Sequence, residues 1–179
     1  LREKYDTEKK YLPSEMEDAV RAIQSGGEEI YMTRFGVYYK PNMILNCERI
    51  VGNGVWNYAE ELLSLELPNW NPTSTTDLKV TGGNLTDVCS NCAKLKTLIL
   101  PKLQYAPHYF ARYSTTLERV QLGSIGYPVT SIGNYCFYND TQENLEITVY
   151  VDAVTLEEIG VKSTAPWGAT NATIIYRNS

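Results

Sequence analysis

The feature that most constrains the fold of this chain is a leucine-rich run that recurs along its middle. Three segments fit the pattern L-x-x-[LV]-x-L and a fourth is a degenerate copy; they span residues 62–69, 95–102, 117–124 and 145–152. Their first leucines lie 33, 22 and 28 residues apart, a spacing typical of stacked repeats. Apolar and polar residues alternate within each run, which predicts a short strand with one face in the core. One unit cannot bury that face alone, so we expect successive strands to pair in a parallel sheet.

A second element recurs between the leucine runs, an apolar pair followed by an aromatic residue. It occupies residues 50–56, 103–110 and 129–137. We expect its aromatic residues Trp56, Phe110 and Phe137 to fill the opposite wall of the core. The widest gap between leucine runs contains the polar stretch 69–77, which we interpret as an inserted loop. The short apolar segments 78–80 and 85–88 are interpreted as extra strands around it.

The two ends of the chain differ from its middle. Ser14 and Glu17 form a capping box that predicts a helix over residues 14–24, ended by Ser25-Gly26-Gly27. Residues 28–40 have the alternating aromatic pattern of hairpin strands, with Gly36 as a turn or bulge. Near the C-terminus, residues 152–160 have a helical pattern and Ile174-Ile175-Tyr176 an apolar strand pattern. We expect this last segment to cap the open end of the repeats.

The repeats resemble a known family. The segments LKTLILP (95–101), LERVQL (117–122) and VTSIGNYCF (129–137) resemble BspA-like leucine-rich repeats, the irregular bacterial type. The resemblance covers roughly residues 44–151 and implies secreted or surface-displayed modules for adhesion and protein contacts, without catalytic residues. The chain departs from the family pattern in its few repeats, in their varying lengths and in LTDVCSNC (85–92), which replaces the I-G-x-x-x-F element.

The terminal segments 3–23 and 165–178 resemble parts of phage or prophage tail-associated proteins of gut bacteria. Together these features predict a fold between α/β and mainly β. The expected architecture is a short irregular leucine-rich-repeat solenoid with an N-terminal helix and strand region and a C-terminal helix–strand cap. The expected domains are residues 1–43, 44–151 and 152–179.

Charge and hydropathy exclude several classes of partner. The net charge is −5 and no basic run occurs, which argues against binding nucleic acid or a membrane surface through clustered lysine and arginine. No segment approaches the roughly 18 apolar residues of a spanning helix. No secretory signal is visible in this chain. From the resemblance we expect an extracellular or surface-displayed bacterial protein, or part of a phage particle.

The cysteines, the single histidine and the acidic pairs form no recognisable active site or metal site. The sequence therefore predicts a non-enzymatic protein with no metal or cofactor. Cys89 and Cys92 form a lone C-x-x-C, which we interpret as core residues, with a disulfide and then a zinc half-site as the alternatives. A catalytic triad would have to use His108, the single histidine, and no G-x-S-x-G motif accompanies it. The acidic pairs at 60–61 and 157–158 are typical of a solvated surface rather than of a glycosidase.

The outward positions of the predicted strands are the expected partner-binding surface. These positions are Ser64, Glu66, Thr97, Ile99, Arg119 and Gln121. Tyr105, Tyr109 and Tyr113 lie four residues apart and either join this surface or pack between repeats. The sequence thus predicts a non-catalytic module that binds a protein or glycan. The alternative is a structural or receptor-binding component of a phage-tail-like or surface assembly, with a homo-oligomer formed through the N-terminal region.

Overall fold

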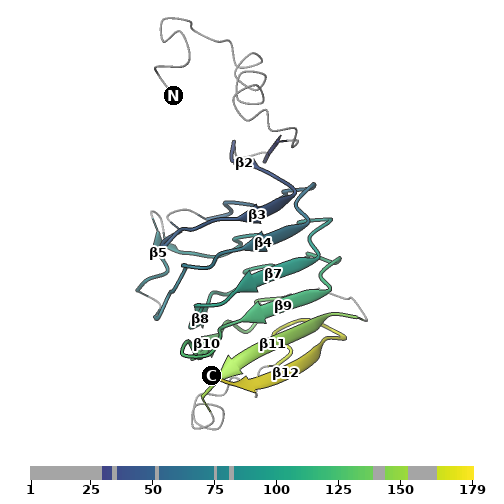
Figure 1. The fold of residues 1–179 in the computed structure, drawn as a ribbon. Helices are drawn as coiled ribbons and strands as arrows, with labels where there is room; N and C mark the ends of the chain where they lie inside the picture. Colours follow the sequence, from purple (N-terminus) through teal and green to yellow (C-terminus); the bar gives the residue numbers. More distant parts are fainter. Residues whose placement is uncertain are drawn as a thin grey trace, which may run out of the picture. The chain divides into compact units, whose positions relative to one another are not determined.

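A computed structural model describes residues 30–33, 36–50, 53–74, 76–80, 83–138, 144–152 and 165–179 (Figure 1). Contacts between residues divide the chain into two units, Leu1–Ile30 and Tyr31–Ser179. All the described residues except Ile30 belong to the second unit. The predicted domain boundaries after residues 43 and 151 stay predictions.

Six parallel strands form the main sheet of this unit, and their order in the sheet follows their order in the chain (Figure 1). The strands are β3 (Asn42–Ile44), β4 (Ser64–Glu66), β7 (Thr97–Leu100), β9 (Arg119–Leu122), β11 (Glu146–Val151) and β12 (Thr173–Asn178). The four leucine runs supply β4, β7, β9 and β11, and the parallel pairing expected of them is confirmed. The register places Leu65 beside Leu98 and Leu98 beside Val120, so like positions of successive runs are neighbours.

Three two-stranded sheets accompany the main sheet. They pair β1 (Tyr31–Met32) with β2 (Tyr38–Tyr39), β5 (Lys79–Val80) with β6 (Gly83–Asn84) and, in parallel, β8 (Tyr105–Ala106) with β10 (Ser131–Ile132). The hairpin predicted within 28–40 is confirmed, with Gly36 at a φ of 79° in its turn. The second strand around the polar insertion is β6, at 83–84, rather than the expected 85–88.

One buried cluster forms the core beneath the main sheet. The inward residues Leu65, Leu98, Val120 and Ile147 are fully buried, and so are the leucines that lead into each run. Trp56, Phe110 and Phe137 belong to the same cluster, as their spacing predicted. Complete burial contributes roughly 1.5–3 kcal/mol for each large aliphatic or aromatic side chain. The repeated leucines therefore drive the stacking of one unit on the next.

The expected fold class is wrong. The described residues contain strands and turns and no helix, and their main element is a six-stranded parallel sheet. The prediction was a leucine-rich-repeat solenoid with an N-terminal helix and strand region and a C-terminal helix–strand cap. The helix predicted over 14–24 lies outside the described residues, and so does all of 152–160 beyond Asp152. The predicted C-terminal strand is confirmed as β12, which pairs with β11 along six residues and is the last strand of the main sheet.

Among the described residues, the connections between the strands of the main sheet are turns that bond to one another, so no helix is needed there. Each turn donates backbone hydrogen bonds to the next, as from Trp56 N to Val88 O and from Cys89 N to Phe110 O, both 2.9 Å. Ala111 N continues the series to Cys136 O at 2.9 Å. These bonds satisfy the backbone groups that a helix would otherwise satisfy within itself, so short turns suffice.

Candidate recognition surfaces

The outward face of the main sheet carries the six strand residues predicted to bind a partner. Two rows of side chains cross this face. The first row is Asn42, Ser64, Thr97, Arg119, Glu146 and Thr173, and the second is Ile44, Glu66, Ile99, Gln121, Thr148 and Ile175. The structure thus brings all six predicted residues onto one surface, which we call the strand face.

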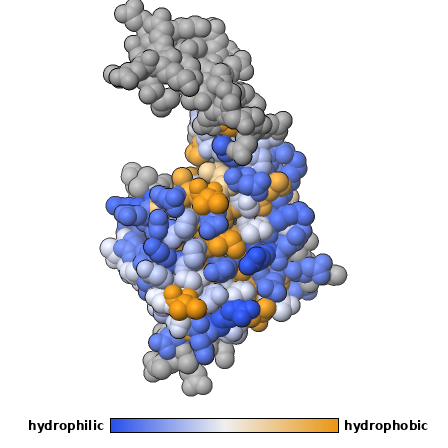
Figure 2. Space-filling model, in the orientation of Figure 1, coloured by the Kyte–Doolittle hydropathy of each residue, from blue (hydrophilic) through white to orange (hydrophobic). Residues whose placement is uncertain are grey.

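The strand face is mixed in character. Ser64 Oγ donates to Asn42 Oδ1 at 2.8 Å, and Lys96 Nζ pairs with Glu118 at 2.7 Å just before the strands begin. Ile44 is 71% exposed, whereas Ile99 and Ile175 are half-buried. In Figure 2 the hydrophobic residues over the sheet are separated by hydrophilic ones. No continuous apolar patch of the kind that marks a large interface is visible from this side.

A second surface is formed by tyrosines on the turns. Tyr109, Tyr113, Tyr135 and Tyr138 make a connected group, which we call the tyrosine cluster. The rings of Tyr109 and Tyr135 are stacked with centroids 5.7 Å apart. Tyr138 meets Tyr135 and Tyr113 edge-on at 5.5 and 5.7 Å. Tyr109 is half-buried, and the other three rings remain between 36% and 47% exposed.

Arg112 holds the tyrosine cluster in place from one side. Its guanidinium carbon lies 4.8 Å from the centre of the Tyr109 ring and 5.7 Å from that of Tyr113. Its Nε forms an ion pair with Asp87, whose carboxylate also accepts a hydrogen bond from Ser90 Oγ at 3.2 Å. Both members of the ion pair are more buried than the exposed pair of Lys96 and Glu118. The guanidinium is therefore fixed by charge and by two aromatic faces together.

The backbone beneath the cluster adopts the left-handed conformation at non-glycine residues. Tyr109 and Tyr113 have φ values of 54° and 59°, and Asp87 and Asn91 have 51° and 57° in the preceding turn. Asn91 N donates to Arg112 O at 2.9 Å, which locks the two turns together. Such conformations cost on the order of 1–3 kcal/mol each and persist only where the surroundings determine them. The spacing of four between Tyr109 and Tyr113 thus places them at the two left-handed positions of one turn.

The three predicted tyrosines have different environments. Tyr105 lies in β8 and packs against the core, as the packing alternative expected. Tyr109 and Tyr113 join the tyrosine cluster. Sequence reasoning missed Tyr135, Tyr138 and Arg112, although Tyr135 and Tyr138 lie at the corresponding turn of the next repeat.

The cysteines pack in the core, whereas the single histidine lies at the surface. None of the four cysteines, all of which lie in the described ranges, forms a disulfide, and Cys89, Cys92 and Cys136 are buried. Cys92 Sγ donates to Trp56 O at 3.1 Å and Cys89 Sγ to Phe110 O at 3.6 Å, so the interpretation as core residues is confirmed. Cys47 is half-buried, and this burial raises the pKa of its thiol.

His108, by contrast, is exposed, and its ring lies 6.3 Å from that of Tyr109. Within the described part of the chain, no three histidine, cysteine or acidic residues are grouped to hold a metal ion.

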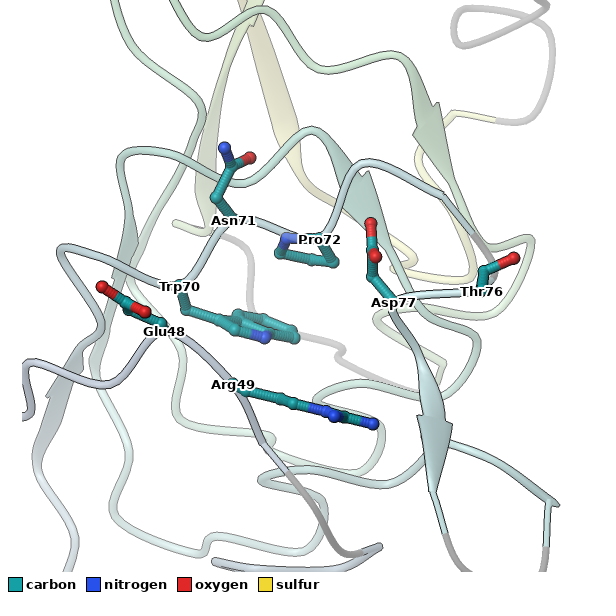
Figure 3. A pocket seen from close by; sticks show the side chains of 7 residues that line it. All are labelled: Glu48, Arg49, Trp70, Asn71, Pro72, Thr76 and Asp77. Atoms are coloured by element: carbon teal, nitrogen blue, oxygen red, sulfur yellow. The ribbon is translucent and has the colours of Figure 1, made fainter.

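Two adjoining hollows lie where the strands of the main sheet end. The first, of about 330 Å³, is shown in Figure 3 and is lined by Glu48, Arg49, Trp70, Asn71, Pro72, Thr76 and Asp77. The second, of about 370 Å³, is lined by Glu48, Asn69, Asn71, Lys102 and Tyr127. They share Glu48 and Asn71 and are called the polar hollow. Sequence reasoning missed this site.

Trp70 forms the floor of the polar hollow. It lies in the stretch interpreted as an inserted loop, yet it is only 2% exposed and stacks on Phe110 with centroids 5.6 Å apart. The side chain of Arg49 lies alongside its indole (Figure 3). Beside them, the Asp77 carboxylate accepts hydrogen bonds from the backbone and side chain of Thr73, which lower its pKa below the ordinary 3.8.

Comparison with known proteins does not extend this description. No protein-family model matches the chain, and no curated protein or solved structure is found to be similar to it. The resemblance to BspA-like repeats therefore stays a prediction, as does the resemblance of the ends to tail-associated proteins. Among the described residues there is also no helix of the length and hydropathy needed to cross a membrane.

Proposed function

We propose that this protein is a non-catalytic recognition module that binds a protein partner through the tyrosine cluster. The observation that carries the proposal is the cluster itself, four contacting tyrosines with three of them well exposed and an arginine fixed among them. Tyrosine and arginine are enriched among the residues that dominate binding energy at protein interfaces. A tyrosine ring also brings a large contact area with only two rotatable bonds, so little side-chain entropy is lost on binding.

The geometry of the rings favours a protein over a sugar at this surface. A sugar stacks on an open, flat ring face, but the half-buried ring of Tyr109 is stacked on Tyr135 and has the Arg112 guanidinium 4.8 Å from its centre. Tyr135 has one face against Tyr109 and a contact with Tyr138. The cluster therefore offers to solvent tyrosine side chains that already pack on one another, each with an apolar ring and a polar hydroxyl. Such groups combine apolar contact with hydrogen bonding, as irregular protein surfaces require.

The proposal is tested by finding a partner and then locating its binding surface. The full chain serves as bait against surface proteins of bacterial and animal cells, and each captured protein is purified and titrated against three variants. We expect Tyr135→Ala to weaken binding by about 2 kcal/mol or more, as at an interface hot spot. Tyr135→Phe keeps the stacking and should retain most of the affinity. Arg119→Ala, on the strand face, is the matched control and should bind like the unaltered protein. A partner insensitive to Tyr135→Ala but lost on Arg119→Ala would contradict the proposal.

A second candidate function is that of a component in a tail-like or surface assembly. The observation in its favour is a group of exposed apolar side chains on and after the first strands. Met32, Tyr38, Ile44 and Leu45 are 47%, 36%, 71% and 38% exposed. Light scattering after size-exclusion chromatography distinguishes the two roles. A stable oligomer of the full chain that Ile44→Asp dissociates supports the assembly, and a monomer supports the free recognition module.

A further inference from the structure

The polar hollow is assembled from residues that follow four successive strands. Glu48 comes after β3, Asn71 after β4, Lys102 after β7 and Tyr127 after β9. Since parallel strands end at the same edge of the sheet, these side chains converge although they lie far apart in sequence. Each half of the hollow is at the small end of the range of about 300–1,000 Å³ typical of small-molecule sites.

Hydrogen bonds hold the amide groups of the hollow in fixed orientations. Asn69 accepts a bond from Lys102 Nζ at 3.0 Å and donates to Asn46 Oδ1 at 3.5 Å. Asn71 Oδ1 accepts a bond from Gln104 Nε2 at 3.1 Å. The NH₂ group of Asn71 then remains to donate, since no described residue accepts from it. Its position beside the rigid Trp70 makes it a preorganised donor.

The charges that line the hollow cancel. Glu48 and Asp77 are opposed by Arg49 and Lys102, so a ligand of either sign gains no net attraction. The lining nevertheless contains both strong donors and strong acceptors at short range. Lys102 Nζ lies over the Tyr127 ring, 5.5 Å from its centre, so this cation occupies the ring face and the lining offers polar groups rather than an open aromatic face. A ligand that matches this lining is neutral and carries groups that donate and accept at once.

We infer that the polar hollow binds a neutral oligosaccharide, with two neighbouring sugar rings in its two halves. Sugar hydroxyls donate and accept simultaneously, which suits a lining that contains both the Glu48 carboxylate and the NH₂ of Asn71. Hydrogen bonds to charged partners supply the larger part of the affinity in such a site. The inference does not rest on the tyrosine cluster, which lies on other turns. A protein partner and a glycan can therefore be bound by separate surfaces.

The test uses the full chain and a panel of soluble sugars. Maltotetraose, cellotetraose and a β-1,3-linked glucotetraose are the neutral probes, and sulfated and uronic-acid tetrasaccharides are the charged ones. Saturation-transfer NMR detects binding and calorimetry measures it. We expect at least one neutral probe to bind and Glu48→Gln to weaken it about tenfold, the value of one charge-assisted hydrogen bond. Asn71→Asp, which keeps the acceptor for Gln104 and removes the donor, should have a similar effect.

Matched controls separate this site from the rest of the surface. Glu60→Gln and Asn134→Asp make the same chemical changes at exposed positions outside the hollow and should leave sugar binding unchanged. Binding of the charged probes alone, or of no probe, overturns the inference. So does binding that survives both hollow variants but is lost on Tyr135→Ala, an outcome that would move the sugar to the tyrosine cluster. None of these results depends on whether a protein partner is found.

Discussion

The strand face and the tyrosine cluster are built from the same repeating unit and use it differently. On the strand face each outward residue has an equivalent in register on the neighbouring strand, as Ser64 has Thr97 and Thr97 has Arg119. Its side chains are mostly polar and interrupted by single isoleucines. On the turns, large rings touch one another above left-handed backbone at Tyr109 and Tyr113. Strands pair along three or more residues in register, whereas the turns are joined by individual backbone hydrogen bonds such as that from Asn91 N to Arg112 O. The strands therefore carry the regular pairing of the sheet, and the turns carry the tyrosine cluster.

The largest expected effect is a loss of stability when a buried strand residue is truncated. Leu98 is fully buried on β7, between Leu65 and Val120. Leu98→Ala should lower the free energy of unfolding by about 2–5 kcal/mol, because it leaves a cavity that the strands on both sides cannot close. Urea unfolding followed by circular dichroism measures the loss. Thr97→Ala, the outward neighbour, should change it by less than about 0.5 kcal/mol. Equal losses for the two variants would show that burial of the inward face of β7 is not the main source of its stability.

The next largest effect is the loss of stability expected when a side chain is added where two turns pack closely. A Cβ atom on Gly133 would lie 2.6 Å from the backbone nitrogen of His108 in the preceding turn. Gly133→Ala should therefore cost about 1–3 kcal/mol, as overpacking does where backbone has to move. Thermal unfolding compares it with Asn134→Ala, an exposed neighbour that should be nearly neutral. A neutral Gly133→Ala variant would mean that the turns adjust to one another more freely than the strands.

A smaller effect concerns the guanidinium within the tyrosine cluster. Arg112→Lys keeps the positive charge but loses the planar group between the rings and Asp87. We expect a loss of about 0.5–1 kcal/mol in the free energy of unfolding. A double-mutant cycle with Asp87→Asn isolates the coupling between the two side chains. Coupling near zero would show that the cluster is held by its rings alone.

The smallest effect belongs to the edge of the strand face. Lys96 and Glu118 form a pair in which both side chains are more than half exposed. Lys96→Ala should cost only about 0.2–1 kcal/mol and the cost should vanish in about 1 M salt, which screens exposed charges. The Arg112→Lys loss should persist at the same salt concentration, because that residue is more buried. If salt removes both losses equally, the two surfaces do not differ in electrostatic environment.

Four strands of the main sheet, β4, β7, β9 and β11, could be predicted because their signal is local, whereas β3 precedes the first leucine run and was not predicted. Alternating leucines within β4, β7 and β9 identify the inward face, and an inward face fixes the register. The sixth strand was harder, since β12 is separated from β11 by a segment with a helical pattern and was expected to belong to a cap. Helical periodicity at the ends led to a fold class that the described residues do not have. Helical periodicity in a sequence does not show whether the segment has a neighbouring apolar surface against which a helix could pack.

The recognition surfaces were less predictable for a different reason. Tyr109 and Tyr113 were noticed because they lie close together in the sequence, whereas Tyr135 meets Tyr109 only through the stacking of two turns. Trp70 was assigned to a polar loop because its neighbours are polar, yet alternation buries it beneath Asn69 and Asn71. Contacts between turns depend on turn length and on left-handed residues. Neither turn length nor the position of left-handed residues produces a periodic pattern in the sequence.

The unequal spacing of the repeats has a consequence for how such a protein can change. The first two leucine runs are 33 residues apart and the next two 22, yet Leu65 pairs with Leu98 as Leu98 pairs with Val120. The longer connection holds β5 and β6 and brings Thr76 and Asp77 to the polar hollow. Additional chain is thus accommodated to the side of the stack, without disturbing the strands on which stability depends. A new ligand preference can be gained by lengthening one connection, and loops designed for other ligands can be grafted at the same place.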